Sequence, residues 1–351
     1  MSTYEYVGLT SPGQLGVAEA TIPEPSEGQV LIKVEYSVLG PFDINNLDRQ
    51  FHVPQYPYVL GIAAAGTVAK VGADRVISTC FPPGNKGFQP YTVQPRNVIA
   101  KIPDALSFEK AVTYPDNLVT AYFTLFNQLS LPEPDDWPSK KSPVNNPPIL
   151  IYGAGATSGQ FTLQLLKFAG YTNVVAAASK QHEEYLKSLG ASHVVDYRSA
   201  SFPGDVVEAA GGKVAVVVDC ISLPKTFALI KEVVAPGGKV AYLAPFKAES
   251  GSMIMVGGEG ELLAEAPSSV TSGFPEGVSF FSVKTFLYQQ DERLAKTLMP
   301  DIVPKLIDIG VQPNRVRLLD HADPLTRVTD AFELLRQNKV SGEKLVVKIG
   351  V

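Results

Sequence analysis

A glycine-rich turn constrains the fold of this chain more than any other segment. Residues 149–152 (Ile-Leu-Ile-Tyr) form a short apolar run, and the turn 153–159 (Gly-Ala-Gly-Ala-Thr-Ser-Gly) follows directly. From Gln160 to Gly170 apolar side chains recur at helical spacing, which predicts a helix. A strand, a glycine turn and a helix in this order are typical of a dinucleotide site, where backbone N–H groups meet a pyrophosphate. The third glycine comes one residue later than in G-x-G-x-x-G, so a turn without a ligand is the alternative.

Strand and helix signals alternate through the region that follows this turn. Short apolar runs linked by helices are typical of a parallel sheet that is covered on both faces. We therefore expect an α/β fold with a Rossmann-type, doubly wound parallel sheet. The further strands are predicted at 174–178, 194–195, 214–218 and 239–243, and the helices at 183–189 and 227–234.

The regions before and after this alternating part have different patterns of predicted strands, turns and helices. Residues 1 to about 115 predict short strands separated by many glycine and proline turns, as in a barrel or sandwich. The proline-rich segment 131–148 predicts an irregular surface connection. The tail predicts helices at 294–310 and 330–337 and a last strand at 344–348.

Size and composition narrow the class of protein. A chain of 351 residues is long enough for two domains. Its net charge of −5, without a long run of either sign, argues against nucleic acid or a membrane surface as a partner. No apolar stretch reaches the roughly 18 residues that span a bilayer, and the N-terminus lacks the layout of a secretion signal. We therefore expect a soluble, cytoplasmic protein. The two cysteines, Cys80 and Cys220, cannot build a disulfide framework or a cysteine-rich zinc site.

The end of the second predicted strand of the parallel sheet indicates which dinucleotide is preferred. Enzymes that use NAD place an Asp or Glu there for the ribose 2′-hydroxyl, and such a carboxylate repels a 2′-phosphate. This chain instead has Ser179 and Lys180, and Tyr197 follows the third strand as a further donor. These residues favour NADPH. The alternative for Lys180 is an ordinary solvated surface lysine.

Taken together, these features resemble the medium-chain dehydrogenase/reductase superfamily, and within it the zinc-free quinone reductases and the fungal trans-acting enoyl reductases. The matching segments are 25–34, 58–61, 65–68, 120–122, 189–197, 218–222 and 341–346, together with the late-glycine turn. The resemblance implies a GroES-like, substrate-binding (catalytic) domain over 1–117 and 286–351. It implies a Rossmann NADP-binding domain over 118–285.

Missing ligands set this chain apart from the zinc-dependent members of the superfamily. Those relatives carry a Cys just after the strand that corresponds to 34–39, and a Gly-His-Glu in place of Leu60-Gly61-Ile62. Tetrahedral zinc needs three or four Cys, His or carboxylate ligands, so no metal is expected. We interpret His52 and His321 as structural or surface residues.

Two departures from the enoyl reductase pattern bear on the site. The segment after the strand usually reads Leu-Asn-Pro-x-Asp in those relatives, often with a lysine soon after. Here Gly40 replaces the asparagine, and Asn46 stands near the position of the lysine. Pro41 and Asp43 are retained, and the resemblance places them near the nicotinamide. The link at 71–76 is shorter than in the family.

The candidate cofactor residues fall into three groups. Gly155, Ala156, Thr157 and Ser158 are predicted to hold the diphosphate, and Ser179, Lys180 and Tyr197 the 2′-phosphate. By resemblance, the nicotinamide half is approached by Ile221, Ser222, Ala244, Pro245 and Ser341, with Thr120 near a ribose.

Tyr58 and Tyr56 are the candidate proton or oxyanion donors, because a phenol is neutral at pH 7 and can donate. Packing of the tyrosine ring is the alternative role for each. Phe42, Asn46, Phe280, Phe281 and Tyr288 are candidates for contacts with the substrate; core packing, subunit contacts or turn formation are the alternatives.

These features lead to a zinc-independent, NADPH-dependent oxidoreductase that reduces the C=C bond of an α,β-unsaturated carbonyl compound, an enone or enoyl thioester, by hydride transfer. An NADPH:quinone reductase and a non-catalytic NADPH-binding protein are the alternatives. The expected partner is a small conjugated carbonyl compound, or an acyl chain on a carrier protein, and the expected state is a monomer or homodimer.

Overall fold

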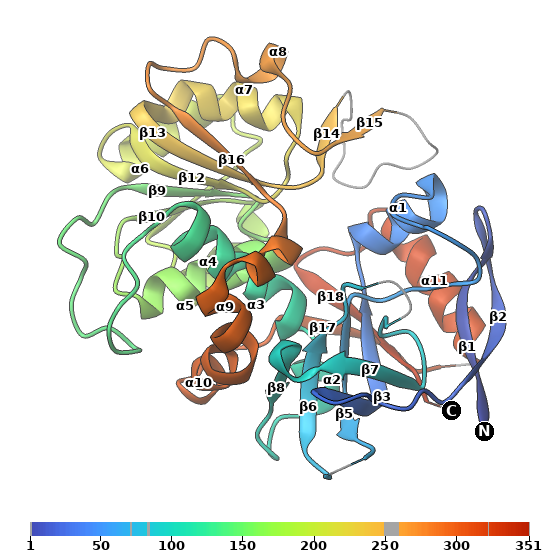
Figure 1. The fold of residues 1–351 in the computed structure, drawn as a ribbon. Coiled ribbons are helices and arrows are strands. Elements are labelled where there is room, and N and C mark those ends of the chain that lie inside the picture. The colour runs from blue at the N-terminus through green and yellow to red at the C-terminus, as the bar shows by residue number, and fades with distance from the viewer. Residues whose placement is uncertain (1, 71, 83–84, 249–259, 322, 351) are drawn as a thin grey trace. The chain divides into compact units, whose positions relative to one another are not determined.

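The computed structural model describes residues 2–70, 72–82, 85–248, 260–321 and 323–350, and these divide into two compact units (Figure 1). Residues up to Val119 and from Phe286 onward belong to unit 1, and the described residues from Thr120 to Thr285 belong to unit 2. The sequence places these boundaries after residues 117 and 285.

Unit 2 is built on a parallel sheet, as the alternating pattern predicts. Six strands pair within its described residues in the order β11-β10-β9-β12-β13-β16. The order reverses between β9 and β12, which is the doubly wound arrangement whose ligands bind outside the carboxyl ends of the strands. The strands are β9 (Ile149–Tyr152), β10 (Val174–Ala177), β11 (His193–Val195), β12 (Val214–Asp219), β13 (Val234–Leu243) and β16 (Ser279–Val283).

Helices alternate with these strands. α4 (Thr157–Phe168) packs against α5 (Glu183–Leu189), and α6 (Phe202–Ala210) packs against α7 (Pro224–Val233). α4 begins three residues before the predicted start, inside the glycine turn. α6 was not predicted; its first turn contains a proline and its last residue precedes Gly211 in the left-handed conformation. A short antiparallel pair, β14 (Phe246–Ala248) and β15 (Glu261–Leu263), and α8 (Ser268–Thr271) complete the unit.

Residues 131–148 contain neither helix nor strand, in agreement with the predicted surface connection. Before it, α3 (Tyr114–Tyr122) continues into a π-helix over Phe123–Gln128. A 3₁₀ helix covers Lys180–His182, and another covers Thr285–Gln290.

Unit 1 contains the β-rich N-terminal region and the tail. Its larger sheet has the order β17-β18-β3-β5-β6-β8, with β7 also paired to β3, and its smaller sheet has the order β2-β1-β4. The strands are β1 (Thr3–Ser11), β2 (Gln14–Thr21), β3 (Gln29–Leu39), β4 (Tyr58–Val59), β5 (Ala63–Val68), β6 (Arg75–Thr79), β7 (Tyr91–Pro95), β8 (Ile99–Lys101), β17 (Arg315–Leu319) and β18 (Glu343–Lys348). A 3₁₀ helix over Arg96–Val98 and α2 (Phe108–Ala111) connect these elements.

The tail completes the N-terminal sheet. β18 pairs antiparallel with β3, with Leu345 opposite Leu39, and parallel with β17. The predicted helix at 294–310 is in fact α9 (Glu292–Thr297), a π-helical segment over Leu298–Ile302 and α10 (Val303–Asp308). Two prolines, Pro300 and Pro304, explain the interruption, because proline removes a helical N–H donor.

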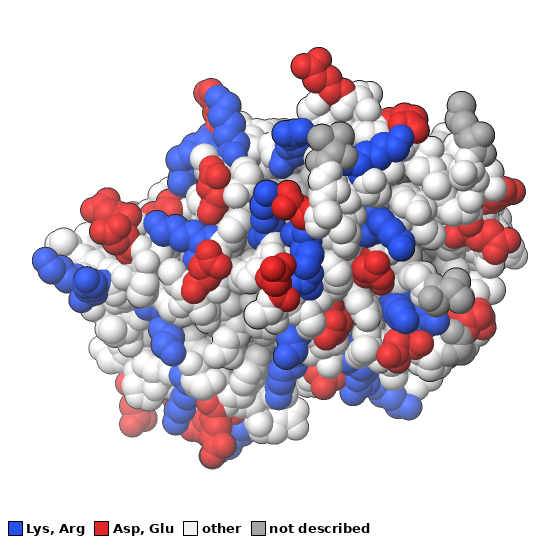
Figure 2. All heavy atoms as spheres, turned by 90° about the horizontal axis from the view of Figure 1, so that it is seen from below, with Lys and Arg blue, Asp and Glu red and all other residues white. Residues whose placement is uncertain are grey.

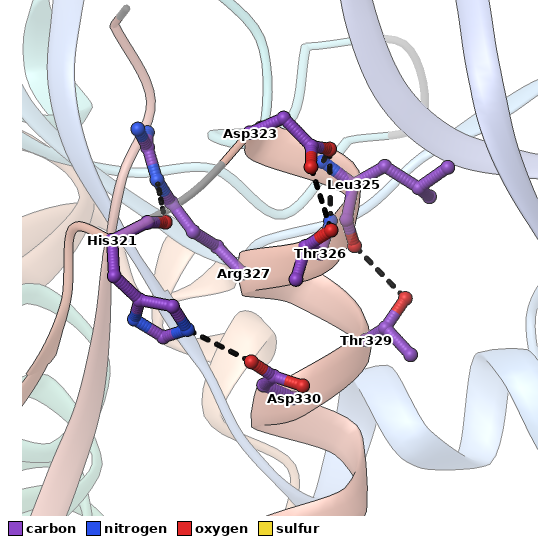
Figure 3. Close-up of polar contacts among 7 residues, drawn as sticks. All are labelled: His321, Asp323, Leu325, Thr326, Arg327, Thr329 and Asp330. Carbon is purple, nitrogen blue, oxygen red and sulfur yellow. Dashed lines mark hydrogen bonds and ion pairs between the residues drawn. The ribbon is translucent and has the colours of Figure 1, made fainter.

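The last helix, α11 (Pro324–Arg336), begins six residues before its predicted start. The Asp323 carboxylate accepts hydrogen bonds from the N–H groups of Leu325 (3.0 Å) and Thr326 (3.1 Å), which caps the helix (Figure 3). α1 (Pro41–Arg49) was not predicted. At its start the Asp43 carboxylate accepts a hydrogen bond from the Gly40 N–H at 3.0 Å.

Charged side chains are mixed on the face that Figure 2 shows, where Lys and Arg are interspersed with Asp and Glu. Nucleic acid binding depends on clustered cations, so this face gives no argument for it. Among the helices of the described ranges, none is both long and apolar enough to cross a lipid bilayer.

Candidate active site

The glycine turn after β9 is shaped by close packing. Gly153 has φ +76°, and a Cβ atom on it would lie 2.6 Å from Ile221. A Cβ on Gly159 would lie 2.7 Å from the Ala154 Cα atom, so α4 can approach the turn only because position 159 is glycine. Gly155 is different, since a Cβ there would meet only His182 at 3.4 Å and Ala178 at 3.9 Å. Internal packing thus explains Gly153 and Gly159, whereas space is left above Gly155.

α4 begins at Thr157, next to that space, and the backbone N–H groups of a first helical turn have no partners inside the helix. Ala156 precedes the helix in an extended conformation (φ −67°, ψ 155°) and has no side chain that could cap it. The N-terminus of a helix of this length carries partial positive charge, which favours an anion. The arrangement fits the diphosphate of a dinucleotide, with Gly155, Ala156, Thr157 and Ser158 as its predicted contacts.

The end of β10 brings together the residues predicted for a 2′-phosphate. Ser179 is half-buried and Lys180 is exposed, and neither is a carboxylate. Arg198, which the sequence argument did not weigh, donates from Nη2 to the Ser179 hydroxyl at 3.2 Å and lies 5.6 Å from the ring centroid of Tyr197. A basic, hydroxyl-bearing surface of this kind fits a phosphate monoester.

One carboxylate lies beside this surface. Asp196 forms an ion pair with Arg198 at 2.7 Å. The hydrogen bonds from the Arg198 side chain and backbone hold the pKa of Asp196 well below its usual range. The charge of the Asp196 carboxylate is therefore balanced by Arg198. In this it differs from the unpaired acid that binds a ribose hydroxyl in enzymes that use NAD.

A buried carboxylate organises the turn after β12, where Ile221 and Ser222 were predicted to meet the nicotinamide half. Asp219 accepts from the N–H groups of Ile221 (2.8 Å) and Ser222 (3.1 Å) and from the Thr226 hydroxyl. Ser222 adopts φ +62°, a conformation that these bonds hold in place.

The loop after β13 is tied to this turn. The Lys247 N–H donates to the Ser222 carbonyl at 3.1 Å, and Lys247 Nζ donates to the Pro245 carbonyl at 3.0 Å. Burial lowers the pKa of Lys247 to about 8. Pro245, also predicted for the nicotinamide half, is therefore linked to Ser222 through Lys247. Its predicted neighbour Ala244 donates its N–H to the Val283 carbonyl at 3.0 Å. Thr120 lies elsewhere in unit 2, with its hydroxyl 2.8 Å from that of Thr285.

Unit 1 contains a buried carboxylate, that of Asp43 in α1. Its carboxylate is fully buried and accepts from the N–H groups of Gly40 (3.0 Å) and Gly61 (2.8 Å). Burial raises its pKa to about 6, although these hydrogen bonds and the charges of Lys86 and Lys344 oppose the rise. Pro41, the first residue of α1, is exposed.

The space beside Gly40 holds an ammonium group. Lys344 Nζ donates to Asp116 Oδ2 at 2.7 Å and to Asn117 Oδ1 at 3.0 Å. A Cβ atom on Gly40 would lie 3.6 Å from this nitrogen. Ser341, predicted near the nicotinamide, lies just before β18 and is exposed.

The positions that correspond to zinc ligands hold no ligating groups, because Gly40 and Gly61 lack side chains and Ile62 is a buried hydrocarbon. Within the described part of the chain, no cluster of three or more His, Cys, Asp and Glu side chains could hold a metal ion. His52 packs against Phe51 (4.3 Å between centroids), and His321 lies 2.8 Å from Asp330 (Figure 3).

The two candidate donors differ in their surroundings. Tyr58 is buried, and burial together with the Asp43 charge raises its pKa to about 12, so its phenol stays protonated at neutral pH. The Tyr56 hydroxyl oxygen is also buried, and no described residue hydrogen-bonds to it. An unpaired buried hydroxyl is costly unless a ligand meets it.

The predicted substrate residues are dispersed. Phe42 lies in α1 with its ring 5.3 Å from Lys86 Nζ. Asn46 donates its amide to the Phe51 carbonyl, so it closes its own loop. Tyr288 is fully buried with its hydroxyl 3.4 Å from that of Thr79.

The phenylalanine pair at 280–281 lies on a strand that the sequence analysis did not predict, β16. Phe280 packs on Phe227 (5.9 Å) and Phe274 (4.9 Å) in a hydrophobic cluster of unit 2. These contacts fit core packing, the alternative that the sequence left open for Phe280. Phe281 is partly buried on the same strand.

A GroES-like β unit and a Rossmann unit with a glycine turn together define the medium-chain dehydrogenases/reductases, and the chain belongs to this superfamily, as predicted. Residues 26–104 match the family model of the alcohol dehydrogenase GroES-like domain, and residues 159–259 match that of the zinc-binding dehydrogenases.

Its relatives include fungal trans-acting enoyl reductases. The chain is 30% identical to the enoyl reductase component lovC of the lovastatin nonaketide synthase of Aspergillus terreus. The matched region covers 94% of this chain and 92% of lovC. It is 28% identical to the trans-enoyl reductase himH of Aspergillus japonicus, over 92% of this chain and 90% of himH. In fold it is similar to the CurK enoyl reductase, with a TM-score of 0.76, 20% identity and 98% of each chain covered. The chain is therefore an oxidoreductase of this branch.

Proposed function

We propose that the chain is a zinc-independent reductase that uses NADPH to reduce the C=C bond of an α,β-unsaturated carbonyl compound. The observation that carries the proposal is the ammonium of Lys344 beside Gly40, where zinc-dependent relatives have a Cys ligand. A cation, two glycines and an isoleucine cannot bind zinc, but buried donors can stabilise negative charge on a carbonyl oxygen. The enoyl reductases among the relatives support this chemistry.

The residues of unit 2 would hold the cofactor. The N–H groups of Gly155, Thr157 and Ser158 would receive the diphosphate beside Ala156, whose own N–H donates to the Gly153 carbonyl at 2.9 Å. The 2′-phosphate would be received by Ser179, Lys180, Tyr197 and Arg198. The Asp219 hydrogen bonds fix the turn at Ile221 and Ser222, and Lys247 fixes Pro245, so both loops are preorganised for the nicotinamide half. When bound, the reduced dinucleotide supplies the hydride.

In unit 1 the substrate carbonyl requires a hydrogen-bond donor. Tyr58 and Tyr56 are the phenols available for it, and Tyr58 stays protonated because burial raises its pKa to about 12. Apolar contacts from Phe42 would flank the conjugated system. An enoyl chain attached to a carrier protein is the proposed form of the substrate, since lovC is by name a component of a polyketide synthase.

Steady-state assays with the purified chain test this function. We expect oxidation of NADPH, and much slower oxidation of NADH, with crotonyl thioester as acceptor, and no loss of activity after dialysis against a chelator. Faster turnover of benzoquinone than of crotonyl thioester or a simple enone would identify a quinone reductase instead. Binding of NADPH without turnover of any of the three acceptors would identify a non-catalytic binding protein.

A further inference from the structure

Lys86 is a second lysine beside Asp43, and within the described residues it lacks the carboxylate and amide partners that Lys344 has. Lys86 is 2% exposed, and its Nζ atom lies 5.3 Å above the ring of Phe42. Among the residues that the structure describes, none accepts a hydrogen bond from this nitrogen or lies within ion-pair distance of it. Buried ammonium groups are normally paired, so Lys86 retains donors for a ligand.

The backbone around Lys86 is fixed. The Gly87 N–H donates to the Gly61 carbonyl at 2.8 Å, and the Gln89 side chain donates to the Lys86 carbonyl at 2.9 Å. A Cβ on Gly87 would lie 2.3 Å from the Ala63 carbonyl oxygen, so this close approach requires glycine. The segment is therefore held against the residue whose N–H binds Asp43, which makes Lys86 a rigid part of the Asp43 centre.

Burial disfavours the positive charge of Lys86, and the nearby carboxylate of Asp43 favours it. The titratable groups that act on it are Asp43 and Cys80. Burial raises the pKa of the Cys80 thiol to about 12, so the thiol is neutral at pH 7, and among the described residues Asp43 is the group that supplies negative charge. Burial lowers the pKa of Lys86 itself. An ammonium in this state gains most from a ligand that develops negative charge.

We propose that Lys86 is a catalytic residue that donates a hydrogen bond to the carbonyl oxygen of the unsaturated substrate. This inference rests on the proposed function. Bound NADPH would supply a hydride to the β-carbon, and the electrons of the C=C bond would shift to the carbonyl oxygen, where Lys86 would stabilise the negative charge. The α-carbon would then take up a proton, either directly from water or from Lys86, and the carbonyl would be restored. Where Lys86 is the donor, solvent would return a proton to it. Asp43 is a positioning residue, because it holds the charge of Lys86 without touching the substrate.

Lys86→Met tests the proposal by separating activity from stability. Loss of one oxyanion donor lowers kcat by about 100-fold, and we expect this loss in kcat/KM for crotonyl thioester with an unchanged KM for NADPH. The melting temperature should stay the same or rise, since the variant no longer buries a cation without an acceptor. Lys101→Met, a change at an exposed lysine of the same unit, is the matched control and should behave as wild type.

The conservative variant Lys86→Arg supplies a readout that a structural role would not change. Wild-type kcat/KM should fall as pH rises through the lowered pKa of Lys86, whereas arginine stays charged, so this alkaline decline should disappear in the variant while part of the activity remains. Wild-type-like activity of Lys86→Met would overturn the assignment, and so would loss of activity in Tyr58→Phe alone. Failure of wild type to reduce any acceptor would instead count against the proposed function.

Discussion

The choice between the two nicotinamide dinucleotides is made by a few side chains at the end of β10. Lys180→Ala removes the exposed cation there. Because a hydrogen bond to a charged group contributes about 1.5–3 kcal/mol, we expect the KM for NADPH to rise at least roughly tenfold and the KM for NADH to stay nearly the same. Initial rates with both cofactors measure this difference.

Lys187→Ala is the matched control, because Lys187 is a surface lysine of α5 whose partner is Glu183 at 2.7 Å. It should leave both KM values unchanged. Equal losses for NADPH and NADH in Lys180→Ala would show that this lysine does not contact the phosphate. The same assay applied to Arg198→Met would then report whether the arginine beside Ser179 has this role.

The sequence contains part of this residue-scale picture. Ser179 and Lys180 could be proposed because they follow a strand whose position after the glycine turn is a local pattern. Arg198 could not, since its contact with Ser179 depends on β10 pairing with β11. The sequence also does not predict how exposed a lysine is, because no local pattern distinguishes buried Lys86 from exposed Lys180.

At the scale of elements, the fit of α4 against the β9 turn is the feature most sensitive to substitution. Gly159→Ala places a Cβ 2.7 Å from the Ala154 Cα atom, and overpacking of this kind costs about 1–3 kcal/mol. The free energy of unfolding should fall by that amount, and NADPH should bind more weakly because the turn must move. Urea denaturation and titration calorimetry measure the two effects.

Gly204→Ala provides the comparison in another helix of unit 2. Gly204 lies in α6, and a Cβ there would meet nothing within 4 Å. Alanine favours the helix over glycine by up to about 1 kcal/mol, so this variant should be slightly more stable and bind NADPH normally. A loss of stability in Gly204→Ala as large as in Gly159→Ala would contradict the role of close packing at the turn.

Elements with a strong local period were predicted well, and those that depend on context were not. The buried runs at β9, β10 and β12 and the amphipathic α5 are recognisable from the sequence. β16 was missed because Ser279 and the partly exposed Phe280 and Phe281 lack both a continuous apolar run and a clean alternation; its pairing with β13 is what makes it a strand. α1 was missed because its cap is the Asp43 carboxylate, which binds Gly40 and also the distant Gly61.

At the scale of the whole molecule, the C-terminal strand β18 pairs with the N-terminal sheet, and no local sequence pattern predicts this pairing. β18 pairs with β3 across most of the chain, and only the resemblance to a family pointed to that pairing. The pairing has a consequence for the site, because β18 carries Lys344 to Asp116 and Asn117 beside Gly40. Sequence-distant strands thus bring together the charges around Asp43.

These charges make the stability of the molecule depend on pH in a definite direction. The pKa of Asp43 is about 6 in the folded chain and near the ordinary value of 3.8 when unfolded, so the folded state binds this proton more tightly. Asp43 therefore favours folding below about pH 4, and this contribution is lost as the pH rises through 6. At 1.36 kcal/mol per unit, the change amounts to at most roughly 3 kcal/mol.

Urea denaturation of wild type and Asp43→Asn between pH 4 and 7.5, followed by circular dichroism, measures this contribution. Asparagine does not titrate, and it retains only one oxygen for the N–H groups of Gly40 and Gly61, so the variant carries a fixed penalty at every pH. Superimposed on that penalty, the advantage of wild type over the variant should shrink as the pH rises from 4 to 7, because only wild type must ionise a buried acid. An advantage that grows over this range would mean that Lys86 and Lys344 outweigh burial and hold the carboxylate in its charged form.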